Sequence, residues 1–365
     1  MPILSKEVKK VFVMGASGFI GCRLVEKLFY HQGHTARCLI RDPGKLSRLA
    51  RFPVDIINGD VLDREGIGDK AADCDVYVFS VHGKDMDPAR SWQVNIDGLR
   101  NMLDMAVENG VHQFIFLSTT AVYEEQFTGG DLDESTVPVC TGKDYAHAKL
   151  EGEKMCLEYA SKHGLQVSIL RPTIVYGPFA PSFTIQPVQL IKSGALRDYG
   201  FFTGLCNPIY VDDVVDAIIT CMYHEPSYGE IFNLSSGETM TWKGFFDQYS
   251  IALTGQPLPT DSKTGYFIKA LPLRVLKNTL KTGVQLAPDF AKKVYSYIKS
   301  KGSGDWSWVK GEDVSAIRHR NYRKKLVFKV DRLRDQLGYQ PAYPLKRGMA
   351  LTRDWLSHHR YISRI

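Results

Sequence analysis

A glycine-rich loop between a predicted strand and a predicted helix constrains the fold of this chain more than any other feature. Gly15, Gly18 and Gly21 stand at GxxGxxG spacing after the apolar run 11–14 and open an amphipathic stretch over 19–30. Such a loop makes a tight turn, lets backbone approach a pyrophosphate, and offers it a positive helix N-terminus. It therefore predicts a dinucleotide site. The loop residues expected to contact the cofactor are Gly15, Ser17, Gly18, Phe19, Ile20 and Gly21.

The first two hundred residues alternate between short apolar runs and longer amphipathic stretches. Continuously apolar strands are typical of a parallel sheet that helices cover on both faces. We therefore predict an α/β Rossmann fold, a doubly wound parallel sheet with a smaller, mainly helical C-terminal substrate lobe. The predicted strands are 11–14, 36–40, 54–58, 76–79, 113–118 and 165–170, and the predicted helices are 19–30, 92–109 and 145–163.

Beyond Gly177 the pattern changes to a stretch rich in proline and aromatic residues, and sheet-like sequence returns at 209–215 and 231–234. Chain order and spatial order are therefore expected to diverge here. The predicted division assigns 1–177 and 209–234 to the NAD(P)-binding domain, and 178–208 and 235–365 to the substrate lobe.

The end of the second predicted strand indicates which nicotinamide cofactor fits. An acidic residue about 20 positions after the glycine loop would bind the ribose hydroxyls of NAD and repel a 2′-phosphate. Arg41 stands there instead, followed by Asp42, and Arg48 is a second candidate phosphate contact or else a solvated helix charge. The pattern favours NADP(H), with NAD as the alternative. Asp60 and Val61, after the third strand, are predicted to contact the adenine.

Tyr145 and Lys149 stand four residues apart at the start of a predicted helix, so they share a face. A lysine charge beside a phenol favours the phenolate and lowers its pKa, which suits general acid–base catalysis near neutral pH. The lysine can also hold the nicotinamide ribose. On its own the pair is common in surface helices, but together with the glycine loop it predicts catalysis.

With these motifs the chain resembles the extended short-chain dehydrogenases/reductases, the group of the NAD-dependent epimerase/dehydratase enzymes. Residues 9–240 match its motifs in order, and the end of the chain, 328–356, also looks like the family's C-terminal part. The ordered motifs lie at 15–21, 59–61, 95–98, 117–123, 145–149, 170–178, 209–214 and 232–234. Leu39 to Pro43 resembles the NADP-using members that act on sterol- or flavonoid-like molecules.

The resemblance implies roles for residues at the strand ends. Thr119 would hydrogen-bond the reacting substrate oxygen beside Tyr145 and Lys149, with Ser118 as the second choice. The implied further cofactor contacts are Ser80, Val81, Pro172, Thr173 and Val175, and the candidate substrate contacts are His82, Thr119, Tyr176, Phe179 and Asn207. His82 and the aromatic side chains have packing as an alternative role.

Departures from the family pattern narrow the reaction. Nucleotide-sugar dehydratases carry an Asp-Glu pair where this chain has Thr120 and Ala121, which disfavours dehydration. Nucleotide-sugar epimerases usually carry an Asn in the motif 173–176 and an Arg before Tyr210, and both are missing here. We therefore predict an NADP(H)-dependent oxidoreductase of a secondary alcohol or ketone on a fairly large, apolar substrate. The alternatives are a nucleotide-sugar epimerase with retained NAD and a non-catalytic NADP-sensing protein.

The charge and cysteine distributions give further expectations. Residues 266–325 hold fourteen lysines and arginines against four acidic residues, a pattern compatible with peripheral membrane contact, while a solvated basic helix is the alternative. No nucleic-acid-binding module accompanies this charge. Seven scattered cysteines favour buried thiols, with neither disulfides nor a metal site. We expect a cytoplasmic protein that forms a homodimer through the helices 92–109 and 145–163.

Overall fold

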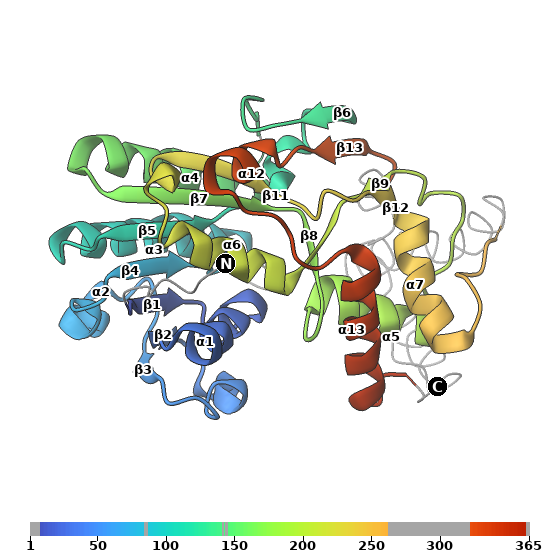
Figure 1. Ribbon diagram of the computed structural model, residues 1–365, viewed down its shortest axis with the longest axis horizontal. Coiled ribbons are helices and arrows are strands. Elements are labelled where there is room, and N and C mark those ends of the chain that lie inside the picture. The colour runs from blue at the N-terminus through green and yellow to red at the C-terminus, as the bar shows by residue number, and fades with distance from the viewer. Residues whose placement is uncertain (1–7, 84–86, 141, 143–144, 262–321, 363–365) are drawn as a thin grey trace, which may run out of the picture.

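A seven-stranded parallel sheet forms the larger part of the molecule (Figure 1). The computed structural model describes residues 8–83, 87–140, 142, 145–261 and 322–362. The strand order is β11-β7-β5-β4-β1-β2-β3, so the order reverses between β1 and β4, where ligands bind in open α/β sheets. The strands are β1 (Lys10–Met14), β2 (Thr35–Ile40), β3 (Asp55–Asn58), β4 (Val76–Phe79), β5 (Gln113–Leu117), β7 (Gln166–Pro172) and β11 (Glu230–Leu234).

Helices cover both faces of this sheet because its central strands are apolar on both sides. The core on one face joins the sheet to α1 (Phe19–Gln32), α6 (Val211–Cys221) and α12 (Asp331–Leu337). The core on the other face joins it to α2 (Arg64–Ile67), α3 (Pro88–Glu108) and α4 (Tyr145–His163). The predicted doubly wound Rossmann fold is therefore confirmed.

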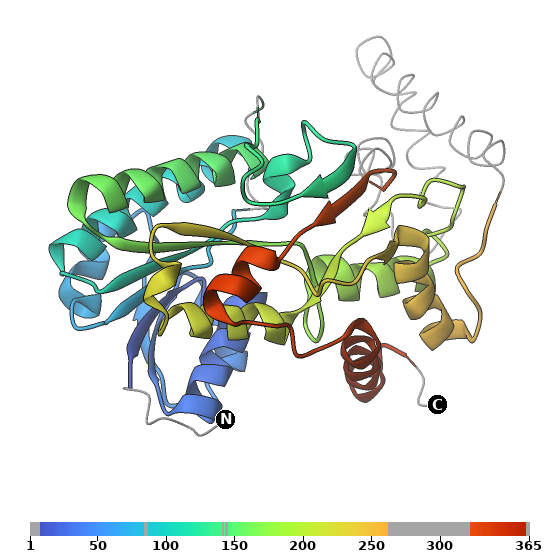
Figure 2. The ribbon, with the colours of Figure 1, turned by 45° about the horizontal axis from the view of Figure 1, so that its top comes forward.

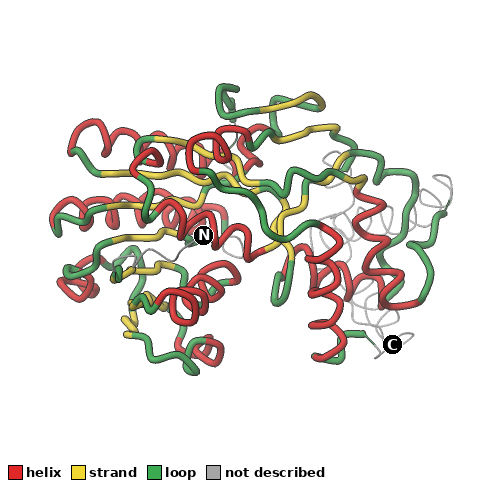
Figure 3. Tube along the Cα trace, in the orientation of Figure 1, coloured by secondary structure: helices red, strands yellow, loops and turns green. Residues whose placement is uncertain are grey.

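A smaller lobe lies beside the carboxyl ends of the strands, on the right in Figures 1 and 3. Its core is largely aromatic and includes Phe202, Trp242, Phe245 and Tyr249. The elements that build it are β8 (Ile174–Tyr176), η4 (Pro181–Ile185), α5 (Gln186–Lys192), β9 (Leu205–Cys206), β10 (Pro208–Tyr210), β12 (Met240–Thr241), α7 (Trp242–Thr254) and α13 (Leu345–His358). The short strands pair as β8 with β10 and as β9 with β12.

Short one-turn elements complete the described chain. They are η1 (Pro43–Arg48), η2 (Gly68–Ala71), η3 (Thr120–Tyr123) and η5 (Glu225–Ser227). A further pair of strands, β6 (Gly129–Leu132) and β13 (Lys325–Phe328), brings together residues almost 200 positions apart; it lies above the main sheet in Figure 1 and stands clear of it in Figure 2.

Two segments differ from the sequence expectation. Residues 209–215 were expected to be sheet-like, but the strand ends at Tyr210 and α6 begins at Val211. Both faces of this helix start are buried, so its apolar pattern is hard to distinguish from that of a buried strand. Residues 331–339, expected in the smaller lobe, pack in the Rossmann core through Leu333, Leu337 and Tyr339.

Most of the basic segment 266–325 lies outside the described residues. Only 322–325 of this segment are described. Within the described part of the chain, no helix is long and apolar enough to cross a membrane.

Candidate active site and cofactor site

The glycine loop lies at the carboxyl end of β1, where side chains would collide with backbone. Gly15 adopts a left-handed φ of +85°, and a Cβ on it would come 2.9 Å from the carbonyl oxygen of Ser80. A Cβ on Gly21 would come 2.3 Å from the carbonyl oxygen of Gly15. α1 begins after Gly18, whose backbone has no side chain to cap the first turn. These residues form the cradle that a dinucleotide pyrophosphate requires, so the chain fits the cofactor that its motif predicts.

In the turn after β2, Arg41 is exposed whereas the Asp42 side chain is bound to the turn's own backbone. Arg41 follows the last residue of β2 and is exposed. The Asp42 carboxylate accepts a hydrogen bond from the backbone N–H of Gly44 at 2.9 Å and so caps η1. The acidic side chain that could select a ribose hydroxyl is thus engaged in the turn, whereas the arginine stands at the position that selects between NAD and NADP.

Arg48, the second predicted phosphate contact, packs against the smaller lobe. Its guanidinium carbon lies 3.9 Å from the centre of the Phe179 ring. Burial lowers the pKa of Arg48, and its buried Nε has no hydrogen-bond partner in the described structure. Phe179, predicted to contact substrate, also packs against Trp355 and His359 of the C-terminal region. Arg48 and Phe179 therefore form a contact between the two parts of the molecule.

The other predicted cofactor residues lie along the edge of the sheet, near the loop. The Ser80 hydroxyl donates to the carbonyl oxygen of Met14 at 2.7 Å, which ties the end of β4 to that of β1. The Asp60 carboxylate accepts from the backbone N–H of Leu62 at 3.1 Å and pairs with Arg90 at 3.3 Å. Val61 is buried against α3 at Gly98, where a Cβ would come 2.5 Å from its Cγ2.

The predicted nicotinamide side of the site lies where β7 passes into β8. The side-chain hydroxyl and backbone N–H of Thr173 both donate to the carbonyl oxygen of Leu234, at 3.0 and 2.9 Å. Pro172 ends β7, and Val175 is half-buried between the Rossmann core and the core of the lobe. Backbone bonds and packing thus fix this segment.

Thr119, Tyr145 and Lys149 come together at the carboxyl ends of β4 and β5. Tyr145 and Thr119 share a side-chain hydrogen bond. The Lys149 ammonium donates to the carbonyl oxygens of Leu117, at 2.9 Å, and Val81, at 3.2 Å. Since Lys149 lies one helical turn after Tyr145, the start of α4 presents both side chains to the same edge of the sheet.

Burial, rather than mutual attraction, sets the charge states of this pair. Desolvation of its hydroxyl raises the pKa of Tyr145 to about 12, although the residue as a whole is 37% exposed, and the bond to Thr119 offsets this only in part. Desolvation lowers the pKa of Lys149, which is 2% exposed, to about 8. The expected lowering of the tyrosine pKa by the lysine is thus not found, and the Tyr145 phenol is neutral near pH 7.

The candidate substrate contacts separate into two groups. The His82 ring lies edge-on to Tyr145, with 4.3 Å between ring centres, and is exposed at the mouth of the site. Tyr176, by contrast, is 1% exposed and packs between Tyr210 and Phe245 in the core of the lobe. Asn207 is buried, and its side-chain amide donates to the carbonyl oxygen of Leu326 at 2.8 Å. These contacts favour packing roles for Tyr176 and Asn207.

Two buried charged residues near the site were not singled out from the sequence. Glu153 and Arg171 form an ion pair of 2.5 Å beneath Lys149, between α4 and β7. The spacing offered one signal, because Glu153 lies eight residues after Tyr145 and therefore on the same helical face. Arg171 stands within the motif 170–178, but nothing local indicates its partner.

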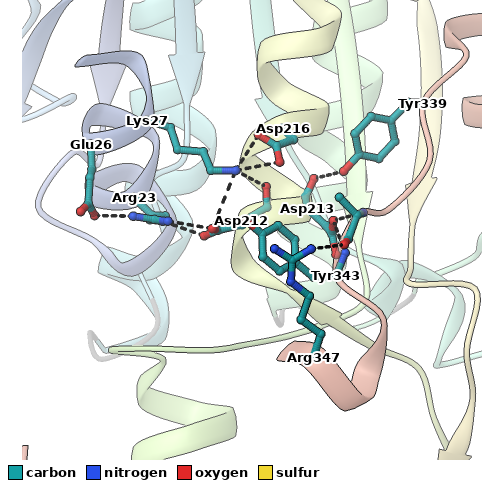
Figure 4. Close-up of polar contacts among 10 residues, drawn as sticks. Arg23, Glu26, Lys27, Asp212, Asp213, Asp216, Tyr339, Tyr343 and Arg347 are labelled. Carbon is teal, nitrogen blue, oxygen red and sulfur yellow. Dashed lines mark hydrogen bonds and ion pairs between the residues drawn. The ribbon is translucent and has the colours of Figure 1, made fainter. Parts of the chain in front are cut away.

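A second polar cluster fixes α1, the helix that follows the glycine loop (Figure 4). Arg23 donates two hydrogen bonds to the Asp212 carboxylate, at 2.6 and 2.7 Å. Lys27 donates to Asp216 at 2.7 Å. The neighbouring carboxylate of Asp213 accepts from the backbone N–H of Ala342 at 2.6 Å, which attaches the C-terminal segment to α6. This cluster therefore connects the cofactor loop, α6 and the C-terminal region.

No group of three or more His, Cys, Asp or Glu side chains in the described part of the chain is arranged to hold a metal ion. None of the seven cysteines forms a disulfide in this structure, and six of them are buried.

Comparison with known proteins agrees with this site. The NAD dependent epimerase/dehydratase family matches residues 11–235. UDP-glucose 4-epimerase of Vibrio cholerae is 25% identical over 252 residues, which cover 68% of this chain and 77% of that protein. The decarboxylating sterol-4-alpha-carboxylate 3-dehydrogenase of Candida albicans is 26% identical over 385 aligned positions, which cover 97% of this chain and 99% of that protein.

Solved structures share the fold. UDP-glucose 4-epimerase of Thermotoga maritima superposes with a TM-score of 0.70 at 19% identity, covering 96% of this chain and 99% of that one. The matched residues 11–235 contain the glycine cradle and Thr119, Tyr145 and Lys149. The chain is an enzyme with an NAD(P)-binding Rossmann fold, and it belongs to the NAD-dependent epimerase/dehydratase family of extended short-chain dehydrogenases/reductases.

Proposed function

We propose that this enzyme is an NADP(H)-dependent oxidoreductase that interconverts a secondary alcohol and a ketone on a fairly large, apolar substrate of sterol, lipid or flavonoid type. The observation that carries the proposal is the hydrogen bond between Thr119 and Tyr145, with Lys149 one turn further on and the glycine cradle beside them. This arrangement holds one proton donor and one orienting hydroxyl next to the place of the cofactor.

The chain's own residues account for the proton and the orientation. The bound nicotinamide supplies or takes up the hydride. The Tyr145 hydroxyl gives its proton to the carbonyl oxygen in reduction, and its phenolate takes a proton from the alcohol hydroxyl in oxidation, while the Thr119 hydroxyl holds the same oxygen. The raised Tyr145 pKa of about 12 keeps the phenol protonated, as proton donation requires. Lys149 stands one helical turn further on, where the family resemblance assigns it the contact with the nicotinamide ribose.

The turn after β2 supports the preference for NADP(H). Arg41 is exposed directly after Ile40, and a guanidinium fork matches the geometry of a phosphate. Asp42, which would repel that phosphate, has one carboxylate oxygen engaged by the backbone of Gly44. The expected NADP(H) selectivity thus rests on Arg41.

One observation supports an apolar alcohol or ketone over a nucleotide sugar, and a second argues against dehydration. The likeness to the Candida sterol dehydrogenase extends over nearly the whole of both chains, whereas the likeness to the Vibrio epimerase covers 68% of this one. At the position of the dehydratase acid–base pair, the Thr120 hydroxyl is buried and directed to the carbonyl oxygen of Pro172 at 3.4 Å, and Ala121 has no titratable group. Neither residue can protonate a leaving hydroxyl or remove a carbon-bound proton.

Binding and turnover experiments test the proposal. We expect cofactor-stripped enzyme to bind NADPH more tightly than NADH in calorimetric titrations, and Arg41→Asp to abolish that preference. We expect NADPH oxidation with 3-keto sterols or flavonoid-type ketones, and Tyr145→Phe to abolish turnover while NADPH affinity stays within about twofold. Tightly retained NAD together with interconversion of UDP-sugars would establish the epimerase instead. Cofactor binding without turnover of any substrate in this panel would support the sensing protein.

A further inference from the structure

Glu153 lies directly behind the catalytic face of α4. It follows Lys149 by one helical turn and Tyr145 by two, and it is buried. Its carboxylate accepts hydrogen bonds from Arg171 Nε at 2.8 Å and Arg171 Nη2 at 2.5 Å, and from the hydroxyl of Ser118. Since Ser118 directly precedes Thr119, one carboxylate connects the helix that carries Tyr145 and Lys149 with the strand end that carries Thr119.

The Arg171 guanidinium is also bound on the side that faces away from Glu153. The remaining guanidinium nitrogen of Arg171, Nη1, donates to the hydroxyl of Tyr123, and the guanidinium lies 4.9 Å from the centre of that ring. The Tyr123 hydroxyl in turn contacts the carbonyl oxygen of Asp133 at 3.1 Å and Oδ1 of Asn233 at 3.4 Å. A buried ion pair is costly to desolvate, and an apolar pair of similar volume is often as stable. Fold stability is therefore a weak reason for a carboxylate at this position.

The charge of Lys149 gives a stronger reason for a carboxylate at position 153. The ammonium donates hydrogen bonds to two neutral carbonyl oxygens, those of Val81 and Leu117, and the Phe116 ring centre lies 4.7 Å from Nζ. Burial in these surroundings favours loss of the proton, whereas the neighbouring groups Cys156 and Glu153 on the same helix oppose it when they carry negative charge. The other titratable or charged groups around the pair are Cys156 and Tyr145 on α4, Arg171 on β7, Tyr123 on η3 and His82 after β4.

Among these groups, Glu153 is the one that carries negative charge beside Lys149 near pH 7. Burial raises the pKa of the Cys156 thiol and that of the Tyr145 phenol, so both are neutral near pH 7. Arg171 opposes Glu153 electrostatically, but it binds the carboxylate on the side of β7, whereas Lys149 lies one turn away on the same helix.

We propose that Glu153 is a positioning residue that keeps Lys149 protonated, and that Arg171 and Ser118 hold the Glu153 carboxylate where it can do so. Removing the carboxylate would lower the protonated fraction of Lys149 near neutral pH. The inference rests on the proposed function only in that Lys149 belongs to the catalytic site.

The test measures the charge of Lys149 directly and needs no substrate. In ¹³C,¹⁵N-lysine-labelled full-length enzyme, the Lys149 side-chain signal is the one missing from Lys149→Met, and its chemical shift is followed from pH 6 to 11. We expect a pKa of about 8 in the wild type. In the double variant Glu153→Met/Arg171→Met, which removes both charges together, we expect this pKa to fall by roughly one unit.

A second double variant guards against loss of the fold. Glu153→Gln/Arg171→Gln keeps hydrogen-bonding groups at both positions but removes the charges. The Lys149 pKa is measured in each double variant that folds. A lowered pKa supports the proposal. An unchanged pKa overturns it, because Glu153 and Arg171 would then contribute only to packing. The control is Glu158→Gln on the same helix, whose exposed partner is Lys162 at 2.5 Å and which we expect to leave the Lys149 pKa unchanged.

The outcome is independent of the proposed reaction. If Lys149 depends on Glu153 as expected but no ketone is reduced, the proposed function fails while the inference stands. If ketones are reduced but the Lys149 pKa ignores Glu153, the inference fails alone.

Discussion

The guanidinium carbon of Arg48 lies 3.9 Å from the centre of the Phe179 ring, which joins the turn after β2 to the smaller lobe. Phe179 adopts a left-handed conformation, with φ of +66°, and its ring packs at a tilt of 57° against that of Trp355 in α13, with 4.8 Å between ring centres. Two residues that the sequence assigned to the cofactor and to the substrate are thus in contact with each other. The turn that follows β2 beside the cofactor site and the smaller lobe are thus in direct contact through these two side chains.

Arg48→Met tests whether this arginine serves packing or phosphate binding. Methionine keeps the apolar stem and removes the cation–π contact, so we expect the free energy of unfolding to fall by about 1 kcal/mol. The proposed preference for NADPH over NADH should be unchanged, because we assign that preference to Arg41. Denaturant unfolding and calorimetry measure the two quantities, with Arg51→Met, which removes the 5.2 Å contact with Phe52, as the matched control. Collapse of the cofactor preference would instead make Arg48 a phosphate ligand.

Gly21→Ala should damage the cofactor cradle. The added Cβ would come 2.3 Å from the carbonyl oxygen of Gly15, and this backbone cannot yield without moving the loop. We expect NADPH affinity to fall at least about tenfold, since the phosphate-binding amides move with the loop. The control is Gly244→Ala in α7, where the nearest atom would be Thr241 Oγ1 at 3.3 Å. Equal NADPH affinity in wild type and Gly21→Ala would show that the loop is not the pyrophosphate site.

Lys149→Met should change how stability depends on pH. The folded chain holds the lysine pKa at about 8, below its ordinary value of 10.5, so between these values the unfolded chain binds more protons. Stability of the wild type relative to Lys149→Met therefore rises from pH 8 to pH 10.5, by roughly 3 kcal/mol in all. Urea unfolding of both proteins across this window measures the difference, in which the tyrosines and cysteines cancel. A flat difference would mean that the buried ammonium carries no desolvation cost.

Asp213→Asn should remove a pH dependence of stability that is opposite in sign to that of Lys149. The Asp213 carboxylate is fully buried, and burial raises its pKa to about 6 even though the N–H groups of Ala342 and Tyr343 donate to it. Between pH 4 and pH 6 the folded chain thus binds more protons, and the stability from this group falls as pH rises.

The neutral amide still accepts from both backbone groups. At pH 8 we therefore expect Asp213→Asn to be at least as stable as the wild type, with no contribution from this position to the slope between pH 4 and 6. Thermal unfolding at fixed ionic strength measures both. The matched control is Asp216→Asn, whose side chain is partly exposed and paired with Lys27, and which we expect to lower stability at pH 8. A clear loss of stability in Asp213→Asn at pH 8 would show that the negative charge itself holds the C-terminal segment.

Local spacing in the sequence was enough to predict the Rossmann sheet and the placement of the main site residues. The run 11–14, the glycine loop and the helix from Phe19 are consecutive in the chain, and the helix 145–163 was predicted with the bounds that α4 has. Tyr145 and Lys149 share a face because helical periodicity is a property of neighbours in sequence. Parallel topology then brings strand ends to one edge, and Thr119 with them.

Tertiary structure alone decided which polar side chains meet and which aromatic side chains are buried. Glu153 pairs with Arg171 across 18 positions, and Asn207 bonds to the backbone of Leu326 across 119. Tyr176 was a candidate substrate contact, yet it lies inside the lobe because α13 packs Gly348 against its hydroxyl, where a Cβ would come within 2.2 Å. Such contacts depend on how distant segments pack, and a pattern of neighbouring residues carries no record of its distant partner. The same burial sets the pKa values of Tyr145 and Lys149, because desolvation is a property of the folded surroundings and not of the residue type.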